Sequence, residues 1–120
     1  DWLSRQTSDD LAVSVWVSTE VAGGLARKVR SGHLPAVEQP AAWSAYLTMV
    51  GQGLEMLPMR TAHFSLATEM AAQPALSLRA GDALHLAIAR DHGASVFTLD
   101  EAMYDAGRLL GLTMIRLDDQ

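Results

Sequence analysis

The chain has 120 residues, of which 49% are hydrophobic, and its formal net charge is −5 at pH 7. This length suffices for one buried core and is too short for two, so we expect residues 1–120 to form a single domain. No stretch approaches the roughly 18 uninterrupted apolar residues of a membrane span, and the first residues lack the basic and apolar regions of a signal peptide. We therefore expect a cytoplasmic protein with no membrane association.

The absence of cysteine excludes disulfides, thiolate metal sites and cysteine nucleophiles. Any metal must therefore take oxygen or imidazole ligands. The negative net charge argues against a broad basic surface that holds nucleic acid by counterion release alone. It does not exclude a nuclease that works through metal ions, because such a site concentrates acids and the bound cations reverse the field that a phosphate meets.

Apolar periodicity, glycines and prolines divide the chain into alternating strands and helices. The expected elements are a strand at 11–16, a helix from 18 or 19 to 30, a helix at 40–51, a strand at 54–57, a helix at 61–72, a helix at 82–90, a strand at 95–98, a helix at 100–110 and a strand at 112–117. Strands that alternate with helices indicate a parallel sheet covered on both faces. We therefore expect an α/β fold, a three-layer α/β/α sandwich with a central parallel sheet.

Two acids lie where this fold gathers ligands. Asp82 starts a helix, where unpaired N–H groups favour a carboxylate, and Asp100 follows the strand that ends at Thr98. Two such acids can share a divalent metal. Each has a purely structural alternative, since Asp82 and Asp100 would also serve as helix caps. A third acid, Glu20, would likewise serve as a first-turn acid favoured by the dipole of the helix that ends at residue 30. Thr98 is equally consistent with an ordinary strand residue.

Three segments resemble the PIN domain, especially the bacterial VapC-type toxins of toxin–antitoxin pairs. The resemblance covers nearly the whole chain and is strongest from Leu78 to Leu117, where residue order and the spacing of the two acids both fit. The segments are Gly81-Asp82-Ala83-Leu84-His85-Leu86-Ala87, Phe97-Thr98-Leu99-Asp100, and Val13-Ser14 to Glu20-Val21.

The resemblance implies an endoribonuclease that depends on Mg²⁺, with Mn²⁺ as a possible substitute, and whose site is built from four acidic positions. Glu20, Asp82 and Asp100 match three of these positions, as metal ligands or as groups that orient the attacking water. Thr98 would bond a carboxylate or a ligand through its hydroxyl. Carboxylates suit this chemistry because Mg²⁺ prefers oxygen ligands and lowers the pKa of a water.

The fourth acid of the family ends a first strand, ahead of a helix that precedes the segment corresponding to Leu11. Asp1, Asp9 and Asp10 lie in a different context and do not replace it. Either the chain lacks an N-terminal segment of the natural protein, or it is a degenerate homologue without its central strand. We favour truncation, because a sheet that loses a central strand leaves costly unpaired backbone groups.

The resemblance also implies an RNA substrate, a homodimer and a cognate antitoxin that covers the acids, often with an inserted basic side chain. The alternative function is therefore that of an inactive or silenced PIN-like protein that acts through protein binding. A nucleotide-binding α/β domain is a weaker alternative, because no Gly-x-Gly-x-x-Gly or Walker-type loop is present and Gly23-Gly24 lies inside a predicted helix.

The histidines have structural interpretations in the sequence. His85 is expected to pack, hydrogen-bonded, with the apolar residues of its helix. His33, His63 and His92 lie in unrelated contexts and show no metal-ligand spacing.

Basic and aromatic residues are weaker candidates for RNA contacts. A cluster at 27–30 suits a helix C-terminus through the helix dipole, and Arg79, three residues before Asp82, is better placed to meet a phosphate. Trp43 and Tyr46 are interpreted as core or dimer contacts and not as base-stacking platforms.

Overall fold

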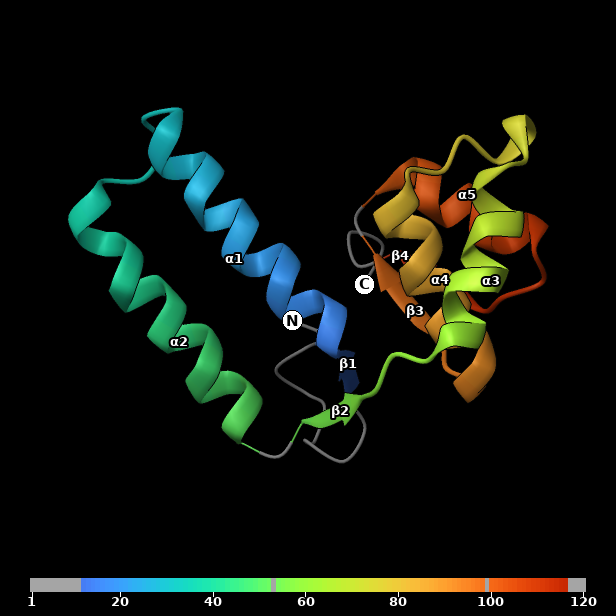
Figure 1. Ribbon diagram of the computed structural model, residues 1–120, viewed down its shortest axis with the longest axis horizontal. Helices are drawn as coiled ribbons and strands as arrows, with labels where there is room; N and C mark the ends of the chain where they lie inside the picture. Colours follow the sequence, from blue (N-terminus) through green and yellow to red (C-terminus); the bar gives the residue numbers. More distant parts are fainter. Residues whose placement is uncertain (1–11, 53, 99, 117–120) are drawn as a thin grey trace. The chain divides into compact units, whose positions relative to one another are not determined.

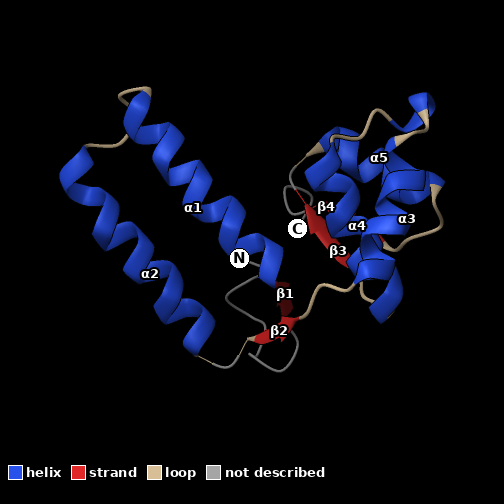
Figure 2. Ribbon diagram, viewed as in Figure 1, coloured by secondary structure: helices blue, strands red, loops and turns tan. Residues whose placement is uncertain are grey.

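The structure is a computed structural model that describes residues 12–52, 54–98 and 100–116. The chain divides into two compact units that meet in sequence between Pro58 and Met59. Each unit combines helices with one parallel pair of short strands (Figures 1 and 2).

The first unit is a helical hairpin attached to a pair of parallel strands (Figure 1). Ala12 of β1 is opposite Glu55 of β2, and Ser14 is opposite Leu57. Pro58 follows β2 directly, where its missing N–H no longer interrupts the pairing. In chain order the elements are β1 (Ala12–Ser14), α1 (Val15–Arg30), the 3₁₀ helix η3 (Ala36–Glu38), α2 (Gln39–Gly51) and β2 (Glu55–Leu57).

Tyr46 connects the two helices of the hairpin. It is the buried residue of α2, its hydroxyl lies 2.8 Å from the hydroxyl of Ser18 on α1, and its ring stacks on Trp43 with centroids 5.3 Å apart. A buried tyrosine is stabilised when its hydroxyl finds a polar partner. This packing agrees with the structural interpretation of Trp43 and Tyr46.

The second unit places three helices around the other strand pair (Figure 2). Val96 of β3 is opposite Met114 of β4, and Thr98 is opposite Arg116. In chain order the elements are α3 (Thr61–Ala71), the 3₁₀ helix η4 (Pro74–Leu76), α4 (Ala80–His92), β3 (Val96–Thr98), α5 (Glu101–Leu109) and β4 (Met114–Arg116).

The helix α4 forms the centre of this unit's core. Its apolar residues are buried around most of the helix, and Leu86 is 0% exposed. The helix α3 packs against it with Ala67 and Met70, and α5 contributes Met103 and Ala106. The buried residues of α4 are Ala83, Leu84, Leu86, Ala87, Ile88 and Ala89.

The expected α/β class, the parallel pairing and the order of elements are confirmed. The described strands form two parallel pairs, one in each unit, and several elements differ from the expectation at their ends. The strand expected at 11–16 ends at Ser14, and α4 runs from Ala80 to His92 instead of from 82 to 90. The helices expected at 82–90 and 100–110 are followed by glycines, and Gly93 and Gly111 adopt φ angles of +63° and +82°, which glycine tolerates best. Leu11 and Leu117, at the ends of expected strands, lie outside the described residues.

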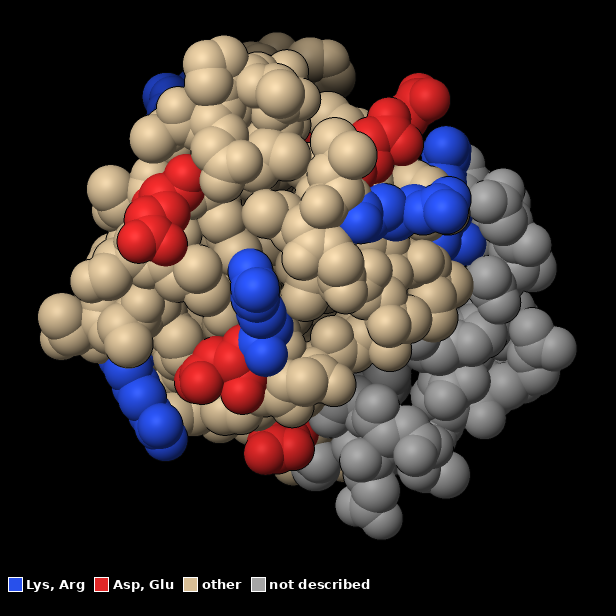
Figure 3. Space-filling model, turned by 90° about the vertical axis from the view of Figure 1, so that its right-hand side faces the viewer, with Lys and Arg blue, Asp and Glu red and all other residues tan. Residues whose placement is uncertain are grey.

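Charged side chains on the face drawn in Figure 3 lie in small separate groups among other residues. None of the helices within the described ranges is long and apolar enough to cross a membrane.

Candidate functional site

The turn between β3 and α5 is held by hydrogen bonds of Thr98 and Asp100. Asp100 is the N-cap of α5, and its Oδ1 accepts the N–H of Met103 at 2.9 Å. The N–H of Asp100 donates to Oγ1 of Thr98 at 3.0 Å, and this hydroxyl in turn donates to Sδ of the buried Met103 at 3.8 Å. Thr98 is therefore a positioning residue for Asp100.

The carboxylate of Asp100 is exposed, and the cap uses only one of its oxygens. Within the described part of the chain, the second oxygen accepts no hydrogen bond. An N-cap and a metal ligand are thus compatible roles for this residue, because a carboxylate offers about four lone-pair sites on its two oxygens.

Asp82 lies in the first turn of α4, where the helix dipole favours an acid. It is not the N-cap, because Arg79 occupies that position and the helix begins at Ala80. The structural alternative that Asp82 merely caps α4 is therefore wrong. Its side chain is half-buried and belongs to the same unit as Thr98 and Asp100.

Glu20 lies on α1 and belongs to the first unit. The expected caps at Ser18 or Thr19 are wrong, because the chain passes from β1 directly into a helix whose N-cap is Ser14. Glu20 consequently lies in the second turn, and the first turn contains no acid. The dipole effect falls off within the first turn, so it no longer accounts for this half-buried acid.

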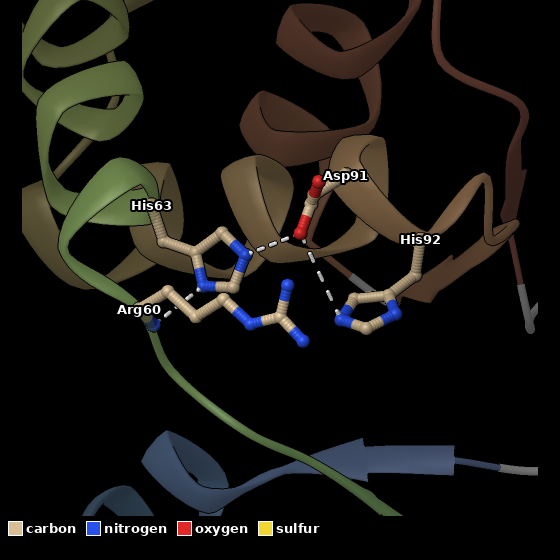
Figure 4. Close-up of polar contacts among 4 residues, drawn as sticks. All are labelled: Arg60, His63, Asp91 and His92. Carbon is tan, nitrogen blue, oxygen red and sulfur yellow. Dashed lines mark hydrogen bonds and ion pairs between the residues drawn. The ribbon is translucent and has the colours of Figure 1, made fainter.

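A second cluster of polar side chains connects α3 to the last turn of α4 (Figure 4). Nε2 of His63 lies 2.8 Å from Oδ2 of Asp91, and Nε2 of His92 lies 4.0 Å from the same oxygen. Nδ1 of His63 accepts the backbone N–H of Arg60 at 2.9 Å, and the ring is almost completely buried. We call His63, Asp91 and His92 the histidine clasp.

The prediction that His63 and His92 lie in unrelated contexts is wrong. The packing of α3 on α4 brings them together, and a pair 29 positions apart on two helices leaves no spacing signal in the sequence. His85, expected in the core, is half-buried on α4.

The ligand atoms of the histidine clasp lie within 4.8 Å of one another, as they would in a metal site. The hydrogen bonds support a structural role. Because Nδ1 of His63 accepts a backbone N–H, the ring proton is on Nε2 and is donated to Asp91. A metal at Nε2 would displace that proton. The ring would then either carry no N–H at all, or take its proton on Nδ1 and lose the hydrogen bond from the N–H of Arg60.

The hydrogen bond from His63 holds the pKa of Asp91 below its ordinary value of 3.8. Burial opposes this shift, and attraction to His63, His92 and Arg60 adds to it. Asp91 therefore stays ionised over the neutral range and keeps accepting from His63.

A family model of the PIN domain matches residues 1–109 of the chain. The chain belongs to the PIN-domain family. The resemblance inferred from the segments around Asp82 and Asp100 is thereby confirmed, and Asp1, Asp9 and Asp10, judged unable to replace the fourth acid, lie outside the described residues.

Two solved structures are similar to this PIN domain in fold. One, the crystal structure of FitAcB from Neisseria gonorrhoeae, has a TM-score of 0.66 at 17% identity, covering 95% of this chain and 80% of that chain. The other, the structure of FitAB bound to an IR36 DNA fragment, has a TM-score of 0.61 at 17% identity, covering 96% and 78%. None of the curated proteins compared with the chain matches it.

The acids of the second unit of this PIN domain fit a hard divalent cation. Asp82 and Asp100 offer carboxylate oxygens, which Mg²⁺ and Mn²⁺ prefer, and the chain has no thiolate to favour a softer metal. The basic residues considered from the sequence lie in different units. Arg79 is the exposed N-cap residue of α4, whereas Arg27, Lys28 and Arg30 fill the last turn of α1, where they complement the helix dipole.

Proposed function

We propose that the chain is a metal-dependent endoribonuclease of the VapC toxin type, which hydrolyses RNA phosphodiester bonds in the cytoplasm. The observation that supports this most is the arrangement of Asp100 in a chain of the PIN family. At the carboxyl end of β3, Thr98 accepts the backbone N–H of Asp100, and the N–H of Met103 donates to one of its carboxylate oxygens, which leaves the other oxygen outside these two bonds. Fold alone does not establish activity, so the proposal depends on this site.

In this proposal Asp82 and Asp100 are metal ligands and Glu20 is the third acid of the site. A bound Mg²⁺ or Mn²⁺ would supply positive charge against the phosphate and lower the pKa of the attacking water. The chain's own contribution is to hold its carboxylates in place before RNA arrives. Thr98 does this through the N–H of Asp100, and the N–H of Met103 fixes the rotation of the carboxylate.

The natural partner in this proposal is an antitoxin that inserts a basic side chain among the acids of a homodimeric toxin. An arginine would satisfy the same carboxylate oxygens that otherwise hold metal. The alternative, an inactive PIN protein that acts only by binding such a partner, predicts the same complex without metal-dependent cleavage.

The test is cleavage of a mixed RNA pool by protein expressed from the complete open reading frame. Reactions contain Mg²⁺, Mn²⁺ or a chelator, and Asp82→Asn and Asp100→Asn are assayed in parallel. Asp91→Asn is the matched control, because it removes an aspartate of the same helix α4, nine residues after Asp82 and roughly 13 Å farther along the axis.

Cleavage that needs metal, falls about a hundredfold or more in Asp82→Asn and Asp100→Asn, and persists in Asp91→Asn supports the nuclease. Folded, partner-free protein that cuts no RNA in the pool overturns the proposal in favour of the binding alternative. Loss of cleavage in Asp91→Asn, with its fold intact, would instead move the metal to the histidine clasp.

A further inference from the structure

One side of α5 brings two guanidinium groups close to the same aromatic ring. The Cζ atoms of Arg108 and Arg116 each lie 5.7 Å from the centroid of the Tyr104 ring. Nη1 of Arg108 also donates to the hydroxyl of Tyr104 at 3.5 Å. We call Tyr104, Arg108 and Arg116 the arginine–tyrosine cluster.

The strand register places this cluster beside the Asp100 turn. Arg116 of β4 is the partner of Thr98 of β3, and paired strands lie about 4.8 Å apart. Both side chains face α5, since Thr98 contacts Met103 and the guanidinium of Arg116 lies by the ring of Tyr104. Arg116 therefore lies at the same carboxyl edge as the residue that positions Asp100.

The helix itself continues the arrangement away from the acid. Tyr104 follows Asp100 by four residues, and Arg108 follows Tyr104 by another four. Residues four apart lie above one another on a helix, so an acid, a ring and a guanidinium succeed each other at intervals of about 5.4 Å or slightly more. The cluster therefore extends along α5 from the Asp100 turn.

The chemistry of the cluster matches a single-stranded nucleic acid. Guanidinium forks pair with phosphate oxygens, and a tyrosine ring stacks on any base. Arg108 is exposed, and no carboxylate of the described residues lies within ion-pair distance of it. Two of the chain's nine lysines and arginines thus lie at one aromatic ring.

We infer that the arginine–tyrosine cluster binds the phosphates and one base of single-stranded RNA next to Asp100. This inference rests on the proposed function for the identity of the ligand. An acidic protein segment would use the guanidiniums but would gain less from the ring, so the observations favour RNA.

The test measures binding separately from cleavage. The full chain is titrated against a fluorescently labelled single-stranded RNA in the presence of chelator, with anisotropy as the readout, at several salt concentrations. The variants are Arg108→Gln, Arg116→Gln and Tyr104→Leu. Arg90→Gln is the matched control, because Arg90 is likewise an exposed arginine in the last turn of a helix.

Each arginine variant is expected to weaken RNA binding about fivefold and to reduce the slope of log affinity against log salt by about 0.7. Tyr104→Leu is expected to weaken binding about tenfold with an unchanged salt slope, because stacking releases no counterions. Arg108→Lys, which retains the charge, should restore most of the salt slope and verifies that loss of fold is not the cause. Arg90→Gln should bind as the unmodified protein does.

Equal RNA binding by the cluster variants and by Arg90→Gln would overturn the inference while leaving metal-dependent cleavage, and thus the proposed function, untouched. Weaker binding in the cluster variants of a protein that cuts no RNA would support the cluster and refute the nuclease. Unchanged RNA binding together with loss of an acidic protein partner would reassign the cluster to that partner.

Discussion

The geometry of the Asp100 turn depends on one side-chain hydroxyl, that of Thr98. It accepts the N–H of Asp100 and donates to Met103, so it fixes both the turn and the start of α5. Thr98→Val keeps the shape and removes these bonds. We expect a loss of about 1 kcal/mol in the free energy of unfolding and a fall in kcat of about tenfold, because the Asp100 carboxylate is less well held.

Urea denaturation and RNA cleavage by the same preparations check this prediction. Thr98→Ser is the control, because it retains the hydroxyl and should keep most of the activity. Full cleavage by Thr98→Val would show that the hydroxyl is an ordinary strand residue, as the sequence also allowed.

A second prediction at the scale of one residue concerns Asp91 and how its contribution to stability depends on pH. Its pKa is lower in the folded protein than its ordinary value of 3.8, chiefly through the hydrogen bond from His63. The resulting stabilisation is fully present above that ordinary value and is lost as the pH falls through the lower folded one. Asp91→Asn still accepts a hydrogen bond but cannot titrate.

We therefore expect the difference in stability between the unmodified protein and Asp91→Asn to be constant near neutral pH and to shrink below about pH 4. Denaturation curves over this pH range measure it. A difference that remains constant down to strongly acidic pH would mean that the histidine clasp gains nothing from the charge of Asp91.

At the scale of elements, the close contact between α5 and β4 depends on a glycine, Gly107, which has no side chain. A Cβ at Gly107 would lie 2.6 Å from Cγ of the buried Met114 and would overlap its Sδ as well. Gly107→Ala gains helix propensity of up to about 1 kcal/mol but overpacks this contact at a cost of roughly 1–3 kcal/mol. We expect net destabilisation.

Thermal unfolding of Gly107→Ala tests this, with Gly51→Ala as the matched control. A Cβ at Gly51, the last residue of α2, meets nothing within 4 Å, so that variant should be neutral or slightly stabilised. Adding Met114→Ala to Gly107→Ala should recover part of the loss. Equal stability of the two glycine variants would show that Met114 moves aside without cost.

The elements themselves follow from local sequence, whereas their ends and cross-contacts do not. Proline near the start of α2 and glycine after α4 act within one turn, and the helices expected at 40–51 and 82–90 lie within two residues of the observed ends. The start of α1 was misplaced because the β-branched Val15 favours a strand, yet lies in a helix that follows Ser14 directly. The pairing of His63 with Asp91 depends on how α3 packs on α4, which no local pattern encodes.

At the scale of the whole molecule, the negative net charge of the chain opposes binding of the proposed substrate, RNA. A chain of charge −5 repels RNA at long range, and its basic groups are few. The site acids would add to this repulsion whenever no cation neutralises them. RNA affinity should consequently depend on divalent cations through the same carboxylates that cleavage requires.

Ca²⁺ offers a way to measure this dependence, because it takes oxygen ligands as Mg²⁺ does but with a looser geometry. We therefore expect the protein with Ca²⁺ to bind RNA but to cleave little of it. At constant ionic strength, Ca²⁺ should raise the RNA affinity of the unmodified protein about fivefold to tenfold, since it reverses the local field at the acids. In chelator, the double variant Asp82→Asn/Asp100→Asn should bind RNA more tightly than the unmodified protein. Its RNA affinity should change little when Ca²⁺ is added. Glu69→Gln, an exposed acid of α3, controls for charge and should respond fully. If Ca²⁺ raised affinity equally in the double variant, the cation would be acting on the RNA alone, and these two acids would not be its ligands.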